Sequence, residues 1–256
     1  MNVLKNIDFY DFSFNGKKLS EFHGIVGGSE PLTTYPLLPS RVYITDRAIG
    51  QDGMTVFDSY LEPRTFDIPV FFEDIDSAGI RNIASWFDVE EPAWFQFEND
   101  DVRIKCCLDS NGSALETIMG ADGQANLKFI AHDPYYYEAI PTVHEYTGLS
   151  GSSFTQSYEN KSQSISYPRI EIYGTDEIGI TIKNSSGDIV SECTMSNVKS
   201  GVIIDSMSGD VFGASGASYY NNFSGTLPKI PKNDNYSLEV TGTVTRIKFT
   251  PNYRWI

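Results

Sequence analysis

The sequence predicts a mainly β protein of two domains. Phe and Tyr are abundant, at 16 and 15 of 256 residues, and together with Ile, Val and Thr they favour strands over helices. Apolar residues make up 40% of the chain, enough to fill substantial cores. Residues 1–140 hold 10 Lys and Arg against 23 Asp and Glu, whereas residues 141–256 hold 9 against 11. This difference in charge, net −13 against net −2, predicts domains 1–140 and 141–256.

The first domain is expected to open with a hairpin. Phe9, Phe12 and Phe14 precede a tight turn at 15–17, and Leu19 and Phe22 are expected to begin the returning strand. Prolines hold residues 30–40 out of regular sheet. The polar stretch 45–55 is expected to be an exposed loop or the tip of a projecting arm.

The middle of the first domain combines strands with one helix. Residues 64–72 alternate as a strand does, and a helix is expected over 75–88, where four apolar residues recur at helical spacing behind an acidic cap. A hairpin is expected over 95–106, turning at 99–101. The Gly- and Ser-rich segment 109–126 is expected to interrupt the sheet, which resumes at 127–131. Pro134 cannot donate to a sheet, which suggests a domain edge.

The second domain is expected to be a β-sandwich. Residues 147–166 are rich in Ser, Gly, Thr and Asn, as linkers are. Beyond them, about eight short apolar runs separated by turn residues predict a sandwich or a jelly roll.

Composition excludes several classes of function. A formal charge of −15 is unsuited to holding nucleic acid or an anionic membrane surface, and no apolar run is long enough to cross a bilayer. The three cysteines, Cys106, Cys107 and Cys193, are an odd number and include two neighbours, so reduced thiols are expected rather than disulfides.

The candidate catalytic and metal-binding residues have simpler explanations. None of the three histidines has metal-ligand spacing to another His or Cys. The pair His132 and Asp133 could orient a triad, but no nucleophile elbow accompanies it. Paired carboxylates at 74 and 76, and at 100 and 101, suit a helix cap and a turn. No enzymatic activity, metal or cofactor is therefore expected.

A saccharide site is the alternative that deserves a test. Tyr219 and Tyr220 precede two asparagines and Phe223, and aromatic faces beside amides suit sugar binding. The competing interpretation is a strand whose alternate aromatic residues fill the core.

Taken in order along the chain, several motifs resemble the distal tail protein (Dit) family of siphophages. The first domain contributes the opening FSFNGK with FHGI after it, the strand 64–72 with its helix, and the run LKFIAHDPYYY at 127–137. The second contributes YPRIEIYG at 167–174, VIIDS at 202–206, LPKI at 227–230 and the closing Arg254 and Trp255. One departure is the Ser-rich linker, which lacks an expected glycine near residues 160–162.

This resemblance implies a fold, an assembly and a location. An N-terminal β-sandwich-like belt domain with one helix would form a hexameric ring, and a C-terminal galectin-like β-sandwich would project outward. The ring would join the tail tube protein to the tail-associated lysin or tip protein and often carries receptor-binding proteins. It would be assembled in the host cytoplasm, and DNA would pass through its channel without specific binding. The alternative function is a carbohydrate-binding adhesin acting through the second domain.

Overall fold

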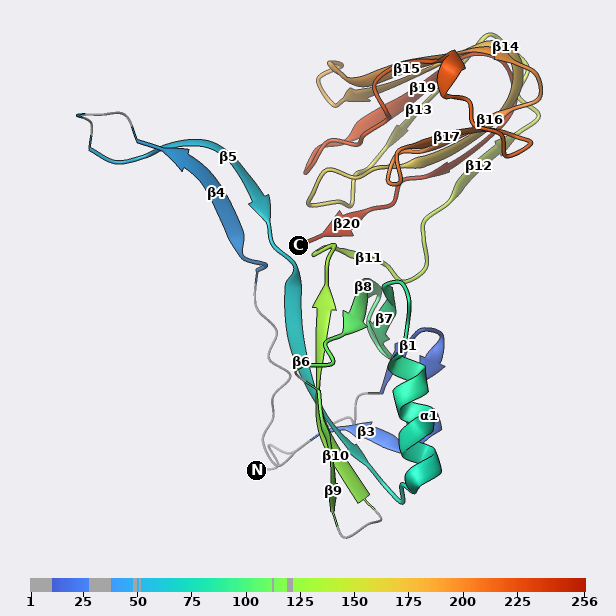
Figure 1. Ribbon diagram of the computed structural model, residues 1–256. Coiled ribbons are helices and arrows are strands. Elements are labelled where there is room, and N and C mark those ends of the chain that lie inside the picture. Colours follow the sequence, from blue (N-terminus) through green and yellow to red (C-terminus); the bar gives the residue numbers. More distant parts are fainter. Residues whose placement is uncertain (1–10, 28–37, 48–49, 51, 112, 119–121) are drawn as a thin grey trace, which may run out of the picture. The chain divides into compact units, whose positions relative to one another are not determined.

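The chain forms two compact units in the computed structural model, Met1–Ala139 with Ile256, and Ile140–Trp255. The structure describes residues 11–27, 38–47, 50, 52–111, 113–118 and 122–256. Strands dominate both units, and α1 (Ser77–Phe87) is the single α-helix among these residues (Figure 1). The predicted mainly β fold with one helix is therefore confirmed.

The first unit is built on one curled sheet. Its strands follow the order β2-β1-β7-β8-β10-β6-β3. The pairing is antiparallel throughout, and the longest ladder joins β10 to β6. The strands of this unit are β1 (Phe12–Phe14), β2 (Lys17–Lys18), β3 (Gly24–Val26), β4 (Arg41–Asp46), β5 (Thr55–Leu61), β6 (Arg64–Phe72), β7 (Ala93–Phe97), β8 (Val102–Leu108), β9 (Leu115–Ile118), β10 (Asp122–Ala131) and β11 (Tyr136–Glu138).

Aromatic rings fill the space inside the curl. Phe66 of β6 and Phe95 of β7 are three places apart in the sheet order, yet their ring centres lie only 5.3 Å apart. Phe129 of β10 meets Phe14 of β1 at 5.5 Å. The two halves of the sheet thus face each other across one core, which gives the sandwich-like arrangement.

Helix α1 closes this core. The Asp76 carboxylate accepts a hydrogen bond from the N–H of Gly79 at 2.7 Å, which confirms the acidic cap. The buried face of the helix carries Ile83, Trp86 and Phe87. The Trp86 indole N–H donates to the carbonyl oxygen of Phe14 at 2.7 Å, so this buried polar group is satisfied.

Two expectations for the first unit were wrong. Residues Leu19–Phe22 form a 3-10 helix, η1, rather than a returning strand, and the sheet edge ends with the two residues of β2. The segment 109–126 does not interrupt the sheet, because β9 pairs with the first residues of β10. Phe9 and residues 28–37 of the proline-containing stretch lie outside the described residues.

The second unit is a sandwich whose two layers share the two longest strands, β14 and β19. Its strands are β12 (His144–Thr147), β13 (Ser153–Tyr158), β14 (Arg169–Asn184), β15 (Ile189–Val198), β16 (Val202–Asp205), β17 (Asp210–Gly213), β18 (Phe223–Gly225), β19 (Tyr236–Thr250) and β20 (Arg254–Trp255). One half of β14 and β19 pairs with β12 and β16, and the other half pairs with β13 and β15. Two layers result, and Tyr158 of β13 meets Phe249 of β19 across them, with ring centres 5.1 Å apart.

Glycines make the corner where β14 and β19 pass from one layer to the other. The β14–β19 register shifts between Tyr173 and Gly174 and again between Thr175 and Gly179. Gly242 of β19 has a φ of +117°, and a Cβ there would strike the carbonyl oxygen of Glu177. Only glycine fits such a position, because the backbone of the neighbouring strand is in contact with it.

The sequence-based outline of this unit needs two corrections. Two of the short apolar runs, at 170–172 and 178–182, belong to the single strand β14 and do not form separate strands. The supposed linker 147–166 contains β13, which pairs with β19. Three of its serines, Ser162, Ser164 and Ser166, are buried, and the Ser162 hydroxyl donates to the carbonyl oxygen of Ser164 at 2.6 Å. The polar composition of 147–166 therefore led to the prediction of a linker, although the segment is a hydrogen-bonded part of the sandwich.

Candidate interaction surfaces

The arm formed by β4 and β5 extends from the first unit as a sheet of two strands (Figure 1). At its base, the N–H of Glu62 donates to the carbonyl oxygen of Ser40 at 2.8 Å. The arm includes the described part of the stretch 45–55, for which an exposed loop or arm tip was expected. The register pairs Val42 with Tyr60 and Ile44 with Asp58, then shifts by a bulge.

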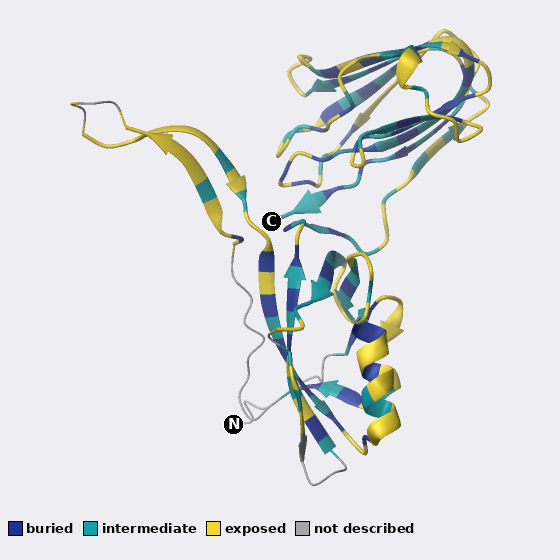
Figure 2. Cartoon of the chain, in the orientation of Figure 1, coloured by how far each residue is buried: buried dark blue, intermediate teal, exposed yellow. Residues whose placement is uncertain are grey.

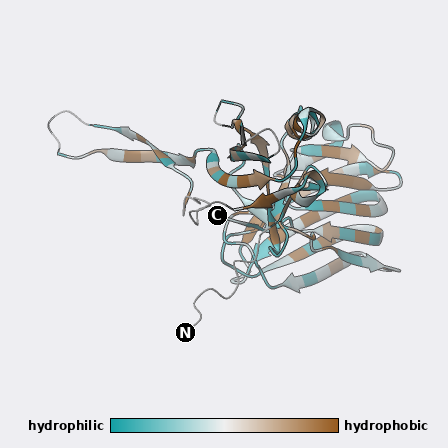
Figure 3. Ribbon diagram, turned by 90° about the horizontal axis from the view of Figure 1, so that it is seen from below, coloured by the Kyte–Doolittle hydropathy of each residue, from teal (hydrophilic) through white to brown (hydrophobic). Residues whose placement is uncertain are grey.

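Apolar side chains occupy both faces of the arm. Opposed residues share a face and successive residues alternate, so Ile44 and Tyr60 lie on one face and Tyr43 on the other. Most of the described part of the arm is coloured as exposed in Figure 2, and Figure 3 shows hydrophobic residues along it. Six large apolar side chains are 50% to 70% exposed: Tyr43, Ile44, Met54, Val56, Phe57 and Tyr60.

An arm of this kind has the features of an interaction surface. An isolated pair of strands is marginally stable in water, and contiguous exposed apolar patches mark contact sites. The sequence predicted an exposed loop or the tip of a projecting arm at 45–55, but it missed the apolar faces of the two strands that flank this polar stretch. The available signal was that apolar residues stand at successive positions, 42–44 and 56–57, rather than at alternate ones.

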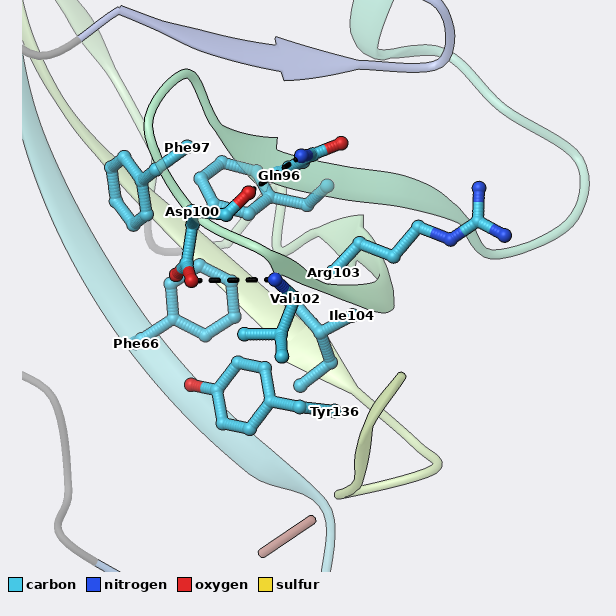
Figure 4. Close-up of a pocket in the computed structure, with 9 residues that line it drawn as sticks. Phe66, Gln96, Phe97, Asp100, Val102, Arg103, Ile104 and Tyr136 are labelled. Carbon is cyan, nitrogen blue, oxygen red and sulfur yellow. Dashed lines mark hydrogen bonds between the residues drawn. The ribbon is translucent and has the colours of Figure 1, made fainter. Parts of the chain in front are cut away.

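A cavity of about 310 Å³ opens between β6, β7, β8 and β11 of the first unit (Figure 4). Aromatic rings dominate its lining, and Asp100 is the carboxylate among the lining residues. One Asp100 oxygen accepts the N–H of Val102 at 3.3 Å, as the predicted turn requires. The cavity therefore brings no second carboxylate or nucleophile to Asp100, and its chemistry is that of an apolar pocket.

Arg64 lies at the end of β6, with its side chain buried at 3% exposure. Its guanidinium stacks on the ring of Tyr136 at 4.8 Å and donates from Nη1 to the Tyr136 hydroxyl at 3.4 Å. Nε and Nη2 have no hydrogen-bond partner, and the described ion pairs do not include Arg64. A buried guanidinium stays charged, so this side chain holds a buried positive charge without an ion pair among the described residues.

The two tyrosines proposed to contact saccharide differ in their surroundings. Tyr219 packs against the core of the second unit, and its hydroxyl donates to the carbonyl oxygen of Asn197. Tyr220 begins the 3-10 helix η2 (Tyr220–Asn222), is 47% exposed and meets Phe223 edge-on at 6.3 Å. The side chain of Tyr219 thus packs against the core of the second unit, whereas the ring of Tyr220 lies at the surface.

The residues considered for catalysis are placed in structural roles. One Asp133 oxygen accepts the hydroxyl of Tyr137 at 2.5 Å. The Nε2 of His132 lies 3.9 Å from the sulfur of Cys107. Among the residues that the structure describes, no group of three or more His, Cys, Asp and Glu could hold a metal ion. In the same residues no helix is long and apolar enough to span a bilayer.

Comparison with known proteins agrees with this architecture. Residues 33–131 match the family model of the phage tail protein RIFT-related domain. The Dit protein of phage SPP1, described as a paradigm of the hub adsorption apparatus in phages infecting Gram-positive bacteria, has a TM-score of 0.72 at 13% identity, over 96% of this chain and 99% of that one. Two chains from structures of the phage p2 baseplate, in its activated conformation with Ca and with Sr, have TM-scores of 0.55 and 0.54 at 9% and 8% identity, over 96% of this chain and 98% of theirs.

No curated protein matches the sequence. At identities this low, the likeness to solved structures is one of fold. The matched domain occupies the arm, α1 and most of the curled sheet, and the structural likeness extends over nearly the whole chain. The resemblance noted in the sequence is thereby confirmed at the level of fold: residues 33–131 match the phage tail protein RIFT-related domain, and the chain has the fold of a siphophage distal tail protein.

Proposed function

We propose that this chain is a structural hub of a phage tail tip, acting through contacts between copies and with neighbouring tail proteins. The fold likeness to the SPP1 Dit protein and to p2 baseplate chains supports a structural, non-enzymatic role at the tail tip. In this proposal six copies form a ring, with unit 1 as the ring-forming belt and unit 2 as the peripheral, galectin-like sandwich.

The arm carries this proposal. Its two strands expose apolar side chains on both faces, and neither face has a cover within the described residues. A second copy of the chain, placed against the arm, would bury those faces and extend the contact from one copy to the next. A repeated contact of this kind, between different surfaces of identical copies, closes into a ring when the rotation between copies allows it.

The remaining partners follow from the position of such a ring. It would join the tail tube protein on one side to the tail-associated lysin or tip protein on the other, and it could carry receptor-binding protein. The net charge of −15 supports passage of DNA without retention, and we propose that part of the acidity of unit 1 faces the channel. Assembly would take place in the host cytoplasm, and the finished ring would belong to the virion tail tip.

Native mass spectrometry of the full chain tests the ring. We expect six copies for the wild type and a monomer for the double variant Tyr43→Ser/Phe57→Ser, because both changes remove apolar area from the arm. The matched control is Ile189→Ser, which alters a 58% exposed side chain of unit 2 and should leave the ring intact. A wild-type chain that stays monomeric both alone and with the tail tube protein would overturn the proposal.

A saccharide-binding role of unit 2 is a second proposal, and the exposed ring of Tyr220 is the observation that favours it. A glycan array probed with the full chain tests it. Saturable binding that Tyr220→Ala abolishes and that Ile189→Ala leaves unchanged would support the adhesin function. Tyr219→Ala is less informative, because its ring and hydroxyl are used in the fold.

A further inference from the structure

A pair of cations lies on the outer face of the β7–β8 hairpin. Trp94 is paired with Lys105 in the register of the two strands, and Arg103 shares this face because side chains alternate along a strand. The Cζ of Arg103 lies 4.1 Å from the centre of the Trp94 ring, and the Nζ of Lys105 lies 5.2 Å from it. We call these three half-buried residues the Trp94 patch.

The Trp94 patch points away from the core. Phe95 and Ile104, which neighbour Trp94 and Arg103 in sequence, are buried on the inner face of the sheet. Figure 4 shows the side chain of Arg103 directed away from the aromatic residues that line the cavity. On that outer face the buried ring of Tyr137 packs edge-on against Trp94 at 5.7 Å, and the two cations beside the indole remain half-exposed at the surface of the unit.

Neither cation has an ion-pair partner among the residues that the structure describes. Within the described part of unit 1, Lys18 pairs with Glu98 and Lys128 with Asp109, but Arg103 and Lys105 form no ion pair. The Nε of Arg103 is buried without a hydrogen-bond partner. Burial also lowers the pKa of this guanidinium, which shows that the charge is held at some desolvation cost.

This charge contrasts with the rest of the unit. Residues 1–140 carry a net −13, so two adjacent cations without carboxylate partners form a local exception. A guanidinium stacked on an indole keeps its N–H edges free for bidentate bonds to a carboxylate. The ring beneath adds apolar contact area. The patch thus fits a surface that presents carboxylates, and a second copy of this acidic chain presents them in excess.

We infer that the Trp94 patch binds carboxylates of a second copy of this chain and is the electrostatic contact that lets like-charged copies associate. This inference rests on the proposed ring. Copies that each carry −15 repel one another, and a positive patch facing an acidic surface offsets that repulsion where the copies touch. The arm then supplies the apolar area, and the patch sets which surfaces can meet.

Charge reversal with a matched control tests the inference. The variant Arg103→Glu/Lys105→Glu and the control Lys17→Glu/Arg81→Glu change the net charge equally, and the control positions are exposed and lie elsewhere on the unit. We expect native mass spectrometry to show loss of most multimer for the patch variant and retention for the control. A neutral variant, Arg103→Gln/Lys105→Gln, should weaken the multimer at least tenfold, and its thermal unfolding temperature shows that it is folded.

Zero-length carbodiimide cross-linking of the wild type gives an independent readout. When unlabelled and ¹⁵N-labelled copies are mixed, we expect Lys105 to be joined to an Asp or Glu of a differently labelled copy. Equal multimer for the patch variant and its control, with Lys105 joined only within one copy, would overturn the inference and leave the ring standing. A wild type that never forms multimers would instead overturn the proposed function itself.

Discussion

Several polar or ionisable side chains in this chain are buried away from water, and Arg64 is the clearest case in the first unit. Its buried guanidinium has one weak hydroxyl contact and an aromatic face, and it forms no ion pair with a carboxylate of the described residues. Removing a desolvated charge and replacing it with an apolar side chain of similar length is often stabilising. We therefore expect Arg64→Met to raise the free energy of unfolding by about 1 kcal/mol or more.

Urea unfolding of full-length Arg64→Met, followed by tryptophan fluorescence, measures this effect. Arg81→Met is the control, because Arg81 is exposed on α1 and its replacement should change stability by only a few tenths of a kcal/mol. A clear loss of stability in Arg64→Met would show that the guanidinium is compensated within the folded chain.

The three cysteine thiols differ from one another in how far they are buried. Cys106 and Cys193 are buried, and Cys107, on the other face of β8, is half-buried. Burial raises the pKa of Cys193 to about 12 and also raises that of Cys106. Because the thiolate is the reactive form, a thiol reagent at about pH 8 should modify Cys107 first and the other two only after unfolding. Counting modified thiols by mass spectrometry checks this, and Cys107→Ser should abolish the fast phase.

At the scale of elements, the corner of β14 and β19 depends on Gly242. A side chain there would meet the backbone of Glu177 at a positive φ. We expect Gly242→Ala to lower the free energy of unfolding of the second unit by about 2 kcal/mol or more, from backbone strain together with the clash. Gly151→Ala is the control, since its nearest contact would be at an ordinary 3.9 Å. Equal unfolding midpoints for the two variants would contradict this account.

The elements that the sequence predicted well are those whose pattern is local. Helix 75–88 follows from apolar spacing and an acidic cap, and the strands around the turn 99–101 follow from alternation. The merged strand β14 was missed because Gly174 and Gly179 resemble turns, whereas they make a bend within one strand. Strand β13 was missed because its partner, β19, lies about eighty residues away. Long-range pairing leaves little trace in local composition.

The candidate surfaces were less predictable than the fold, for a related reason. Tyr219 and Tyr220 are neighbours with the same side chain, but at the start of a 3-10 helix Tyr219 packs against the core and Tyr220 faces solvent. Likewise, Arg103 and Lys105 follow the ordinary alternation of a half-buried strand. Which carboxylates lie near these two side chains depends on the strands that pair with β8, and this pairing cannot be read from a single sequence.

At the scale of the whole molecule, the chain should lose stability in alkali. Burial raises the pKa of Cys193 to about 12, and burial, followed by contacts with other tyrosines, raises the pKa of Tyr158 and Tyr236. Below about pH 8, folded and unfolded chains hold these protons alike. Above it the unfolded chain releases them while the folded chain does not, so unfolding is favoured as the pH rises.

The expected slope is about 1.4 kcal/mol per pH unit for each fully shifted group. Urea midpoints between about pH 7.5 and pH 10.5 measure this slope, and Tyr236→Phe should reduce it, because that variant removes one such group. A midpoint that does not depend on pH across this range would contradict it.

The sharing of β14 and β19 by both layers also dictates when the second unit can fold during synthesis. Strands β12 and β13 have no partner in the second unit until residues 236–250 have left the ribosome, because both pair with β19. A nascent chain that stops before this point holds the strands of a sandwich without the strand that organises them. We therefore expect the second unit to complete its fold only after β19 has been synthesised, and chains that end before β19 to lack the ladders of β12 and β13.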